Sequence, residues 1–118
     1  MTGDIFGQTI VRVRAGVRTD RGGNESADWS AAAVTRETFD RVSVQPSSQT
    51  ETTDQVSTVR ISGYRVISEP GTTPDITALD RIEYRGHTFA VEGEVALWPD
   101  PDGDDHIELG MRRIGGAA

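Results

Sequence analysis

The stretch of residues 80–92 constrains the fold most strongly, because apolar and polar residues alternate on both sides of one turn dipeptide, Arg85-Gly86. Successive side chains of a strand point to opposite faces, so a two-residue period predicts a strand with one buried face. A glycine-containing pair between two such segments is typical of a tight turn, and we therefore predict an antiparallel hairpin. Its buried face is predicted to consist of Ile82, Tyr84, His87, Phe89 and Val91.

The same period recurs elsewhere in the chain. Strands are predicted at residues 9–18, 38–45, 56–68 and 106–114, with residues 95–98 as a short continuation of the hairpin. In the first strand the predicted inward residues are Thr9, Val11, Val13, Ala15 and Val17, and the predicted outward residues are Arg12, Arg14 and Arg18. In the last strand the predicted inward residues are Ile107, Leu109 and Met111.

Three residues interrupt the alternation. Phe39 has the parity opposite to that of Val42 and Val44, which requires a bulge or burial at a sheet edge. Pro46 is predicted to end the second strand, and Gly63 to break the register of the third. About six short strands and no convincing helix favour an all-β fold, a small antiparallel barrel or sandwich with long polar loops. Closure into a β-barrel also leaves no exposed edge strand.

Length and composition narrow the classes of protein further. At 118 residues the chain is predicted to form a single domain, with a flexible arm at 1–8, a long polar loop at 45–55 and a frayed tail at 115–118. The net charge of −7 argues against a surface that grips phosphates. The absence of cysteine excludes disulfides and thiolate sites. No apolar run approaches the roughly 18 residues that a membrane-spanning helix needs, so we expect no membrane partner.

Candidate sites for catalysis or metal binding fail on their spacing. An EF-hand calcium loop needs a glycine at its sixth position and a Glu at its twelfth. Counted from Asp100 in the acidic loop 100–105, Gly103 is at the fourth position and Met111 at the twelfth, so the loop does not match. His87 is expected to be packed and hydrogen-bonded inside the hairpin, and nothing requires it to meet His106. No Gly-x-Ser-x-Gly motif or phosphate-binding loop occurs. We therefore predict no enzyme, and no catalytic, metal-binding or cofactor-binding residues, with a looser calcium site in the loop 100–105 as the alternative to a solvated turn.

The order of the sequence elements carries a resemblance over roughly residues 40–114. These elements are Val42-Ser43-Val44-Gln45-Pro46-Ser47-Ser48, Thr50-Glu51, Asp54, the strand 58–67, the hairpin segment 75–93, Trp98 and the terminal strand 107–113. In this order they resemble the head-to-tail stopper family of long-tailed siphophages, also called head completion or head–tail connector proteins, particularly those of phages that infect actinobacteria. The family consists of small β-barrels, in agreement with the fold predicted from the residues.

The resemblance implies a structural role in the virion neck, at the head–tail junction, after assembly in the host cytoplasm. The implied partners are other copies in a ring, typically of twelve, a portal–adaptor ring above, and a tail completion or terminator protein below. Double-stranded DNA would pass through without sequence-specific binding. By position, the loop 45–55 matches the family's channel-constricting loop. The gating residues implied are Ser47, Ser48, Thr50, Glu51, Thr52, Thr53 and Asp54.

Two further features predict contacts with other subunits. The arginine face of the first strand, Arg12, Arg14 and Arg18, is expected either to meet acidic edges of a neighbouring copy or to be solvated. Trp98 stands in a polar context and is expected to anchor a protein interface, with a lid over one end of the barrel as the alternative. Another neck or tail component, such as a tail completion or minor tail protein, is the nearest competing function. A stand-alone ligand-binding barrel is a more distant one.

Overall fold

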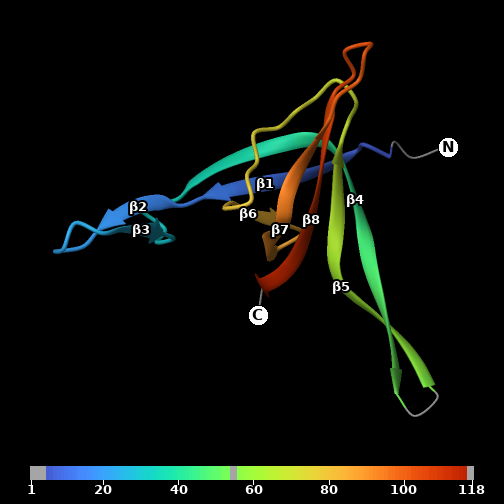
Figure 1. Cartoon of the computed structure of the whole chain (residues 1–118), viewed down its shortest axis with the longest axis horizontal. Coiled ribbons are helices and arrows are strands. Elements are labelled where there is room, and N and C mark those ends of the chain that lie inside the picture. Colours follow the sequence, from blue (N-terminus) through green and yellow to red (C-terminus); the bar gives the residue numbers. More distant parts are fainter. Residues whose placement is uncertain (1–4, 54–55, 117–118) are drawn as a thin grey trace.

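Six strands close into an antiparallel barrel in the computed structural model, which describes residues 5–53 and 56–116 (Figure 1). The barrel order is β1-β4-β5-β8-β7-β6, and two further strands, β2 and β3, form a separate two-stranded sheet. The strands are β1 (Gln8–Arg14), β2 (Gly16–Thr19), β3 (Glu25–Asp28), β4 (Thr35–Thr53), β5 (Val56–Ser68), β6 (Arg81–Tyr84), β7 (His87–Trp98) and β8 (His106–Gly116). The described residues contain no helix. The predicted all-β barrel is therefore confirmed.

The hairpin of β6 and β7 forms as the sequence predicts. Arg85 and Gly86 both have positive φ, 51° and 79°, as a two-residue type I′ turn requires. Ile82 and Phe89 face each other across the ladder and are almost fully buried. Tyr84 packs beside them, in an edge-on cluster of rings with Phe89 and Tyr64. The hairpin thus supplies one wall of the core.

The barrel interior is filled by side chains from all six strands and from one connection. The buried apolar residues that pack together are Ile10, Val42, Val44, Val66, Ile76, Ile82, Phe89, Val91, Ile107, Leu109 and Met111. Ile76 comes from the long connection between β5 and β6 and not from a strand. A six-stranded barrel is narrow enough to be filled in this way, so its interior serves as the core.

The predicted bulge at Phe39 is present. Gln8 pairs with Val42 but Ile10 pairs with Phe39, so β4 carries one extra residue, and Arg41 within it has φ 63°. The bulge lets Phe39 pack against the core although its parity differs from that of Val42. The predicted break near Gly63 is also confirmed, because the register between β4 and β5 shifts between Ser47 and Ser48, opposite Gly63.

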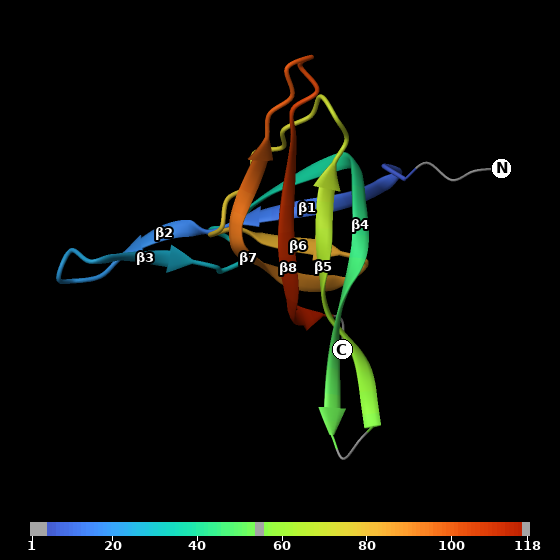
Figure 2. The ribbon, with the colours of Figure 1, turned by 45° about the vertical axis from the view of Figure 1, so that its right-hand side comes forward.

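The predicted loop at residues 45–55 is wrong for residues 45–53, which belong to strand β4. β4 and β5 stay paired from Val42↔Ser68 out to Thr53↔Val56, as a two-stranded ribbon that leaves the barrel (Figures 1 and 2). Pro46 does not end the strand. At Pro46, β4 pairs with β5 alone, because its pairing with β1 reaches only to Val42. A proline is tolerated where one side of a strand is unpaired.

The two chain ends were also predicted imprecisely. Gln8, expected in the arm at 1–8, belongs to β1, and Gly115 and Gly116, expected in the tail at 115–118, belong to β8, whereas residues 1–4 and 117–118 lie outside the described residues. The first strand is shorter than predicted. It ends at Arg14, and β2 then pairs with β3 in a hairpin that extends away from the barrel on the side opposite to the start of β1 (Figures 1 and 2).

Candidate functional site

Most of the predicted gating residues lie on the ribbon formed by the outer parts of β4 and β5. Ser47 stands at the base of the ribbon opposite Gly63, and Thr53 stands at its far end opposite Val56. Between them on β4 lie Ser48, Thr50, Glu51 and Thr52, whereas Asp54 lies outside the described residues. The seven residues from Ser47 to Thr53 span roughly 20 Å at about 3.3 Å per residue. The segment predicted to contain the gating residues therefore projects well beyond the barrel wall.

The ribbon contributes little to the barrel itself. Beyond Val42 on β4, and before Gly63 on β5, each strand has one neighbouring strand among the described residues. Each strand therefore presents a row of unpaired backbone donors and acceptors on its outer edge. A projection of this kind is suited to reaching another surface or the axis of an assembly.

The predicted outward arginine face of β1 is wrong for Arg12 and Arg14. Arg12 is buried, 7% exposed, and donates from Nη1 to the Asp75 carbonyl oxygen at 2.8 Å. Its Nη2 lies 3.2 Å from the Glu37 carboxylate. Arg14 donates from Nε and Nη2 to the two carboxylate oxygens of Asp80, each at 2.9 Å. The two arginines lie on the same parity as Ile10 and join β1 to the connection before β6.

Asp80 is the centre of this charged cluster. Its side chain is almost fully buried and also accepts a hydrogen bond from the backbone N–H of Thr77 at 2.7 Å. Burial alone would raise the pKa of Asp80, but the hydrogen bonds from Arg14 and Thr77 outweigh it and leave the pKa below its ordinary value. The same bidentate hydrogen bond raises the pKa of Arg14. The cluster is therefore charged at neutral pH and holds the chain together internally.

Arg18 lies apart from the other two predicted interface arginines. It is exposed on β2, where its charge adds to the hydrogen bonds from Ser30 that lower the pKa of Asp28. The hairpin of β2 and β3 touches the barrel side through Trp29, whose ring lies under the Arg81 guanidinium at 3.9 Å. A shallow groove of about 500 Å³ runs beneath this hairpin, and exposed Val17 and Leu79 contribute to its walls.

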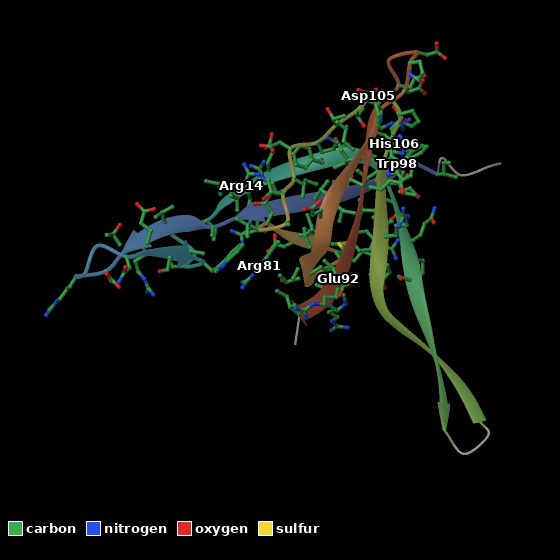
Figure 3. All side chains as sticks on the ribbon, in the orientation of Figure 1. Arg14, Arg81, Glu92, Trp98, Asp105 and His106 are labelled. Carbon is green, nitrogen blue, oxygen red and sulfur yellow. The ribbon has the colours of Figure 1, made fainter. Side chains whose placement is uncertain are left out.

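Trp98 lies at the opposite end of the barrel from the ribbon base, beside the acidic loop 99–105 (Figure 3). Trp98 is half exposed, at 50%, and its ring stacks on that of His106 with an angle of 8° between the ring planes. His106 Nε2 lies 2.9 Å from Glu108 Oε2. That hydrogen bond, together with the ion pair to Arg65, holds the pKa of Glu108 below its ordinary value. Leu97 next to Trp98 is exposed as well, so this end presents apolar surface next to four aspartates.

A second surface feature was not found from the sequence. At the base of the ribbon, a pocket of about 270 Å³ is lined by three arginines, Arg65, Arg112 and Arg113, with Glu92 on its rim. The Arg-Arg pair of the terminal strand was visible in the sequence, but its proximity to Arg65 depends on the pairing of β5 with β8. The partners of Arg12 and Arg14 were missed for the same reason, since Asp75 and Asp80 lie more than 60 residues away along the chain.

Several kinds of site were sought within the described residues. No group of three or more His, Cys, Asp or Glu side chains there is arranged to hold a metal ion. In the acidic loop, carboxylates bind the loop's own backbone, with Asp102 N–H donating to Asp100 and Asp100 N–H donating to Asp105. His87 is half-buried, and its Nδ1 is buried without a described hydrogen-bond partner, contrary to expectation. The part of the chain that the structure describes also holds no helix that is long and apolar enough to cross a membrane.

Comparison of the chain with protein-family models and with curated proteins gave no match.

Proposed function

We propose that this chain is a structural component of a phage neck, a head-to-tail stopper that forms a ring and closes the DNA channel after packaging. The observation that carries the proposal is the ribbon of β4 and β5, which projects from a small closed barrel (Figure 2). Its far end is the polar segment that the sequence resemblance assigns to the channel constriction. In this role the barrels form the wall of the ring, with a portal–adaptor ring above and a tail completion or terminator protein below.

The proposed mechanism is a steric gate that involves no catalysis. Ribbons roughly 20 Å long reach inward from the ring and obstruct the channel. The acidic residues Glu51 and Asp54 repel DNA phosphates, and the Ser and Thr hydroxyl groups of this segment form hydrogen bonds with neighbouring ribbons. The hinge of the movement is the base of the ribbon, where the pairing of β4 with β5 shifts register at Ser47. Movement of the ribbon away from the axis when the tail attaches reopens the channel.

The filled interior of the barrel favours this function over a ligand-binding barrel. A barrel that stores a small ligand keeps a cavity between its walls, whereas here eleven apolar side chains pack together inside. Another neck or tail component, such as a tail completion or minor tail protein, would share the barrel and the virion location. Such a component would contact different neighbouring proteins, and deletion of its gene would affect a different step of virion assembly.

The first test is electron microscopy of particles from a host infected with phage that lacks this gene. Emptied heads next to complete, unattached tails are the expected result. Filled, stable heads with absent or malformed tails would move the protein to the tail pathway, and normal virions would contradict a structural role in the virion.

A shortened ribbon tests the gate itself. Ser48 and Ile61 face each other across the ladder, so residues 49–60 can be replaced by Asn-Gly, which favours a two-residue hairpin turn. We expect heads that assemble but lose DNA before tail attachment. The matched control keeps the full length and neutralises the charge, with Glu51→Gln and Asp54→Asn, and should retain most of the DNA. Retention of DNA by the shortened variant would rule out the steric gate.

A further inference from the structure

The two ends of β8 carry opposite charges that other described residues neutralise only in part. Before β8 begins, the loop 99–105 contains four aspartates, Asp100, Asp102, Asp104 and Asp105. Among the described residues none of the four forms an ion pair, and the hydrogen bonds that the carboxylates of Asp100 and Asp105 accept come from backbone N–H groups of the same loop. Leu97 and Trp98 lie next to this loop, and both are exposed, Leu97 at 59% and Trp98 at 50%.

The far end of β8 carries the arginine pocket, lined by Arg65, Arg112 and Arg113. Arg113 has no acidic partner among the described residues, and Arg112 reaches the Glu92 carboxylate only at 3.8 Å, near the limit of an ion pair. Arg65 is paired with Glu108. Ile114, next to the pocket, is also exposed. Each end of β8 therefore combines charge of one sign with an exposed apolar side chain.

These two ends cannot meet within one molecule. Asp105 and Arg112 are separated by seven residues of extended chain, roughly 20 Å. Figure 3 shows Asp105 and Trp98 at one end of the barrel and Glu92, on the rim of the pocket, at the other. Any pairing of these charges must therefore involve a second molecule.

We infer that the acidic loop 99–105 of one copy inserts into the arginine pocket of a second copy, with Leu97 and Trp98 packing near Ile114. Carboxylates match the forked donors of arginine, so a loop of four aspartates is the complementary ligand for this pocket. The contact joins two different surfaces of identical chains, and such a head-to-tail contact produces a closed ring when the rotation between copies is suitable. The inference rests on the proposed ring-forming function and names the contact that builds the ring.

An acidic loop fits the pocket better than a nucleic acid does. Duplex DNA is held by a continuous track of Lys and Arg that neutralises many phosphates, whereas this chain carries a net charge of −7 and the pocket includes Glu92 on its rim. A pocket of about 270 Å³ accepts one loop tip. The pairing also offsets the repulsion between neighbouring acidic subunits in a ring.

A cysteine cross-link tests the contact directly, because the chain has no cysteine of its own. A variant with Asp102→Cys and Arg113→Cys carries one partner at each end, so mild oxidation of the purified protein should give a ladder of disulfide-linked dimers, trimers and larger species. The matched control combines Asp102→Cys with Arg21→Cys, at the exposed turn of the β2–β3 hairpin, and should cross-link far more slowly. Equal rates in the two variants would overturn the inference.

Reversal of the charges gives an independent test. Arg112→Asp with Arg113→Asp, and separately Asp102→Arg with Asp104→Arg, should each abolish self-association in sedimentation experiments, whereas an equal mixture of the two variants should restore it. Failure of the mixture would contradict the contact. Normal self-association of the Arg112→Asp, Arg113→Asp variant with lost binding to a DNA duplex would assign the pocket to nucleic acid instead. Both tests use purified protein, so their outcome is separate from that of the gene deletion. If the protein cross-links into a ladder but phage that lacks the gene forms normal virions, the contact between copies is supported and the neck function is refuted.

Discussion

At the scale of single residues, Asp80 is the side chain on which most of the internal polar structure depends. It accepts hydrogen bonds from Arg14 and from the backbone of Thr77 while almost fully buried. Replacement of Asp80 by Asn keeps the size of the side chain but removes the charge and one acceptor of the Arg14 fork. We expect the free energy of unfolding to fall by about 2 to 3 kcal/mol, as measured by urea unfolding at neutral pH.

Asp75→Asn is the matched control for this substitution. Asp75 also approaches Arg14, at 3.1 Å, but its side chain is 71% exposed. Exposed ion pairs are screened by water and contribute at most about 1 kcal/mol. Equal losses for Asp75→Asn and Asp80→Asn would mean that burial does not determine the strength of these contacts.

The lowered pKa of Asp80 also predicts how stability depends on pH. A carboxyl group whose pKa is lower in the folded chain than in the unfolded chain stabilises the fold fully above the unfolded pKa, about 3.9 for Asp. This stabilisation is lost as the pH falls from that value through the lowered folded pKa. The difference in unfolding free energy between the unmodified protein and Asp80→Asn should therefore be constant near neutral pH and shrink in acid. Unfolding curves recorded at a series of pH values measure it, and a difference that grows on acidification would contradict the sign.

The parity of β1 shows where residue-level prediction fails. The alternation of Val11 and Val13 with arginines predicted that the valines face inward. Val13 is indeed buried, but the β1 residue in the packed core cluster is Ile10, and Arg12 follows it on the same face and is buried as well. Both faces of this strand carry apolar side chains, so the period alone does not choose between them. The choice depends on Asp75 and Asp80, which supply carboxylates to one face from a distant part of the sequence. No local pattern reports such partners.

At the scale of strands, Gly63 marks the boundary between the ribbon part of β5, which precedes it, and the part of β5 that pairs with β8. A Cβ atom at this position would lie 2.5 Å from the backbone carbonyl oxygen of Met111, closer than real contacts allow. Gly63→Ala should therefore destabilise the protein by about 1 to 3 kcal/mol through a forced shift of β8. Gly110→Ala, on β8 itself, is the control, because its nearest contact would be an ordinary 3.7 Å. Thermal unfolding distinguishes the two, and similar midpoints for both variants would show that β8 moves freely.

The ribbon shows why a strand can be predicted as a loop. Residues 45–53 contain no large apolar residue, and a strand is recognised in a sequence mainly by alternation of buried and exposed positions. The outer part of β4 lies against β5 alone and covers no core, so no such alternation is needed. In the β6–β7 hairpin and β8 the opposite holds, since one face is buried, and there the period predicted Ile82, Phe89, Leu109 and Met111 correctly. Sequence patterning thus identified the walls of the core and missed the projection.

At the scale of the whole molecule, the shape is more extended than that of a compact domain. The radius of gyration is 16.9 Å, whereas a compact domain of this length has one of about 13 to 14 Å. The excess reflects the two hairpins, β2–β3 and the β4–β5 ribbon, which extend from the barrel in different directions (Figure 1). Two-stranded ribbons are only marginally stable alone in water, and long unpaired edges invite association. In the neck function that we propose, neighbouring subunits would cover these projections.

This division of the molecule predicts a graded stability that hydrogen exchange can measure. Amides of residues 46–53 and 56–62 have one neighbouring strand, whereas those of Ile107–Met111 lie between β5 and β7 in the closed barrel. Local opening of the ribbon therefore leaves the core intact and costs less than opening of β8. In the free protein we expect ribbon amides to exchange orders of magnitude faster than those of β8. In the assembled ring the ribbon amides should become protected, because neighbouring ribbons then cover their edges. Equal protection of ribbon and β8 in the free protein would show that the projection is rigid without partners, and a gate that must move at its base would then lose its physical support.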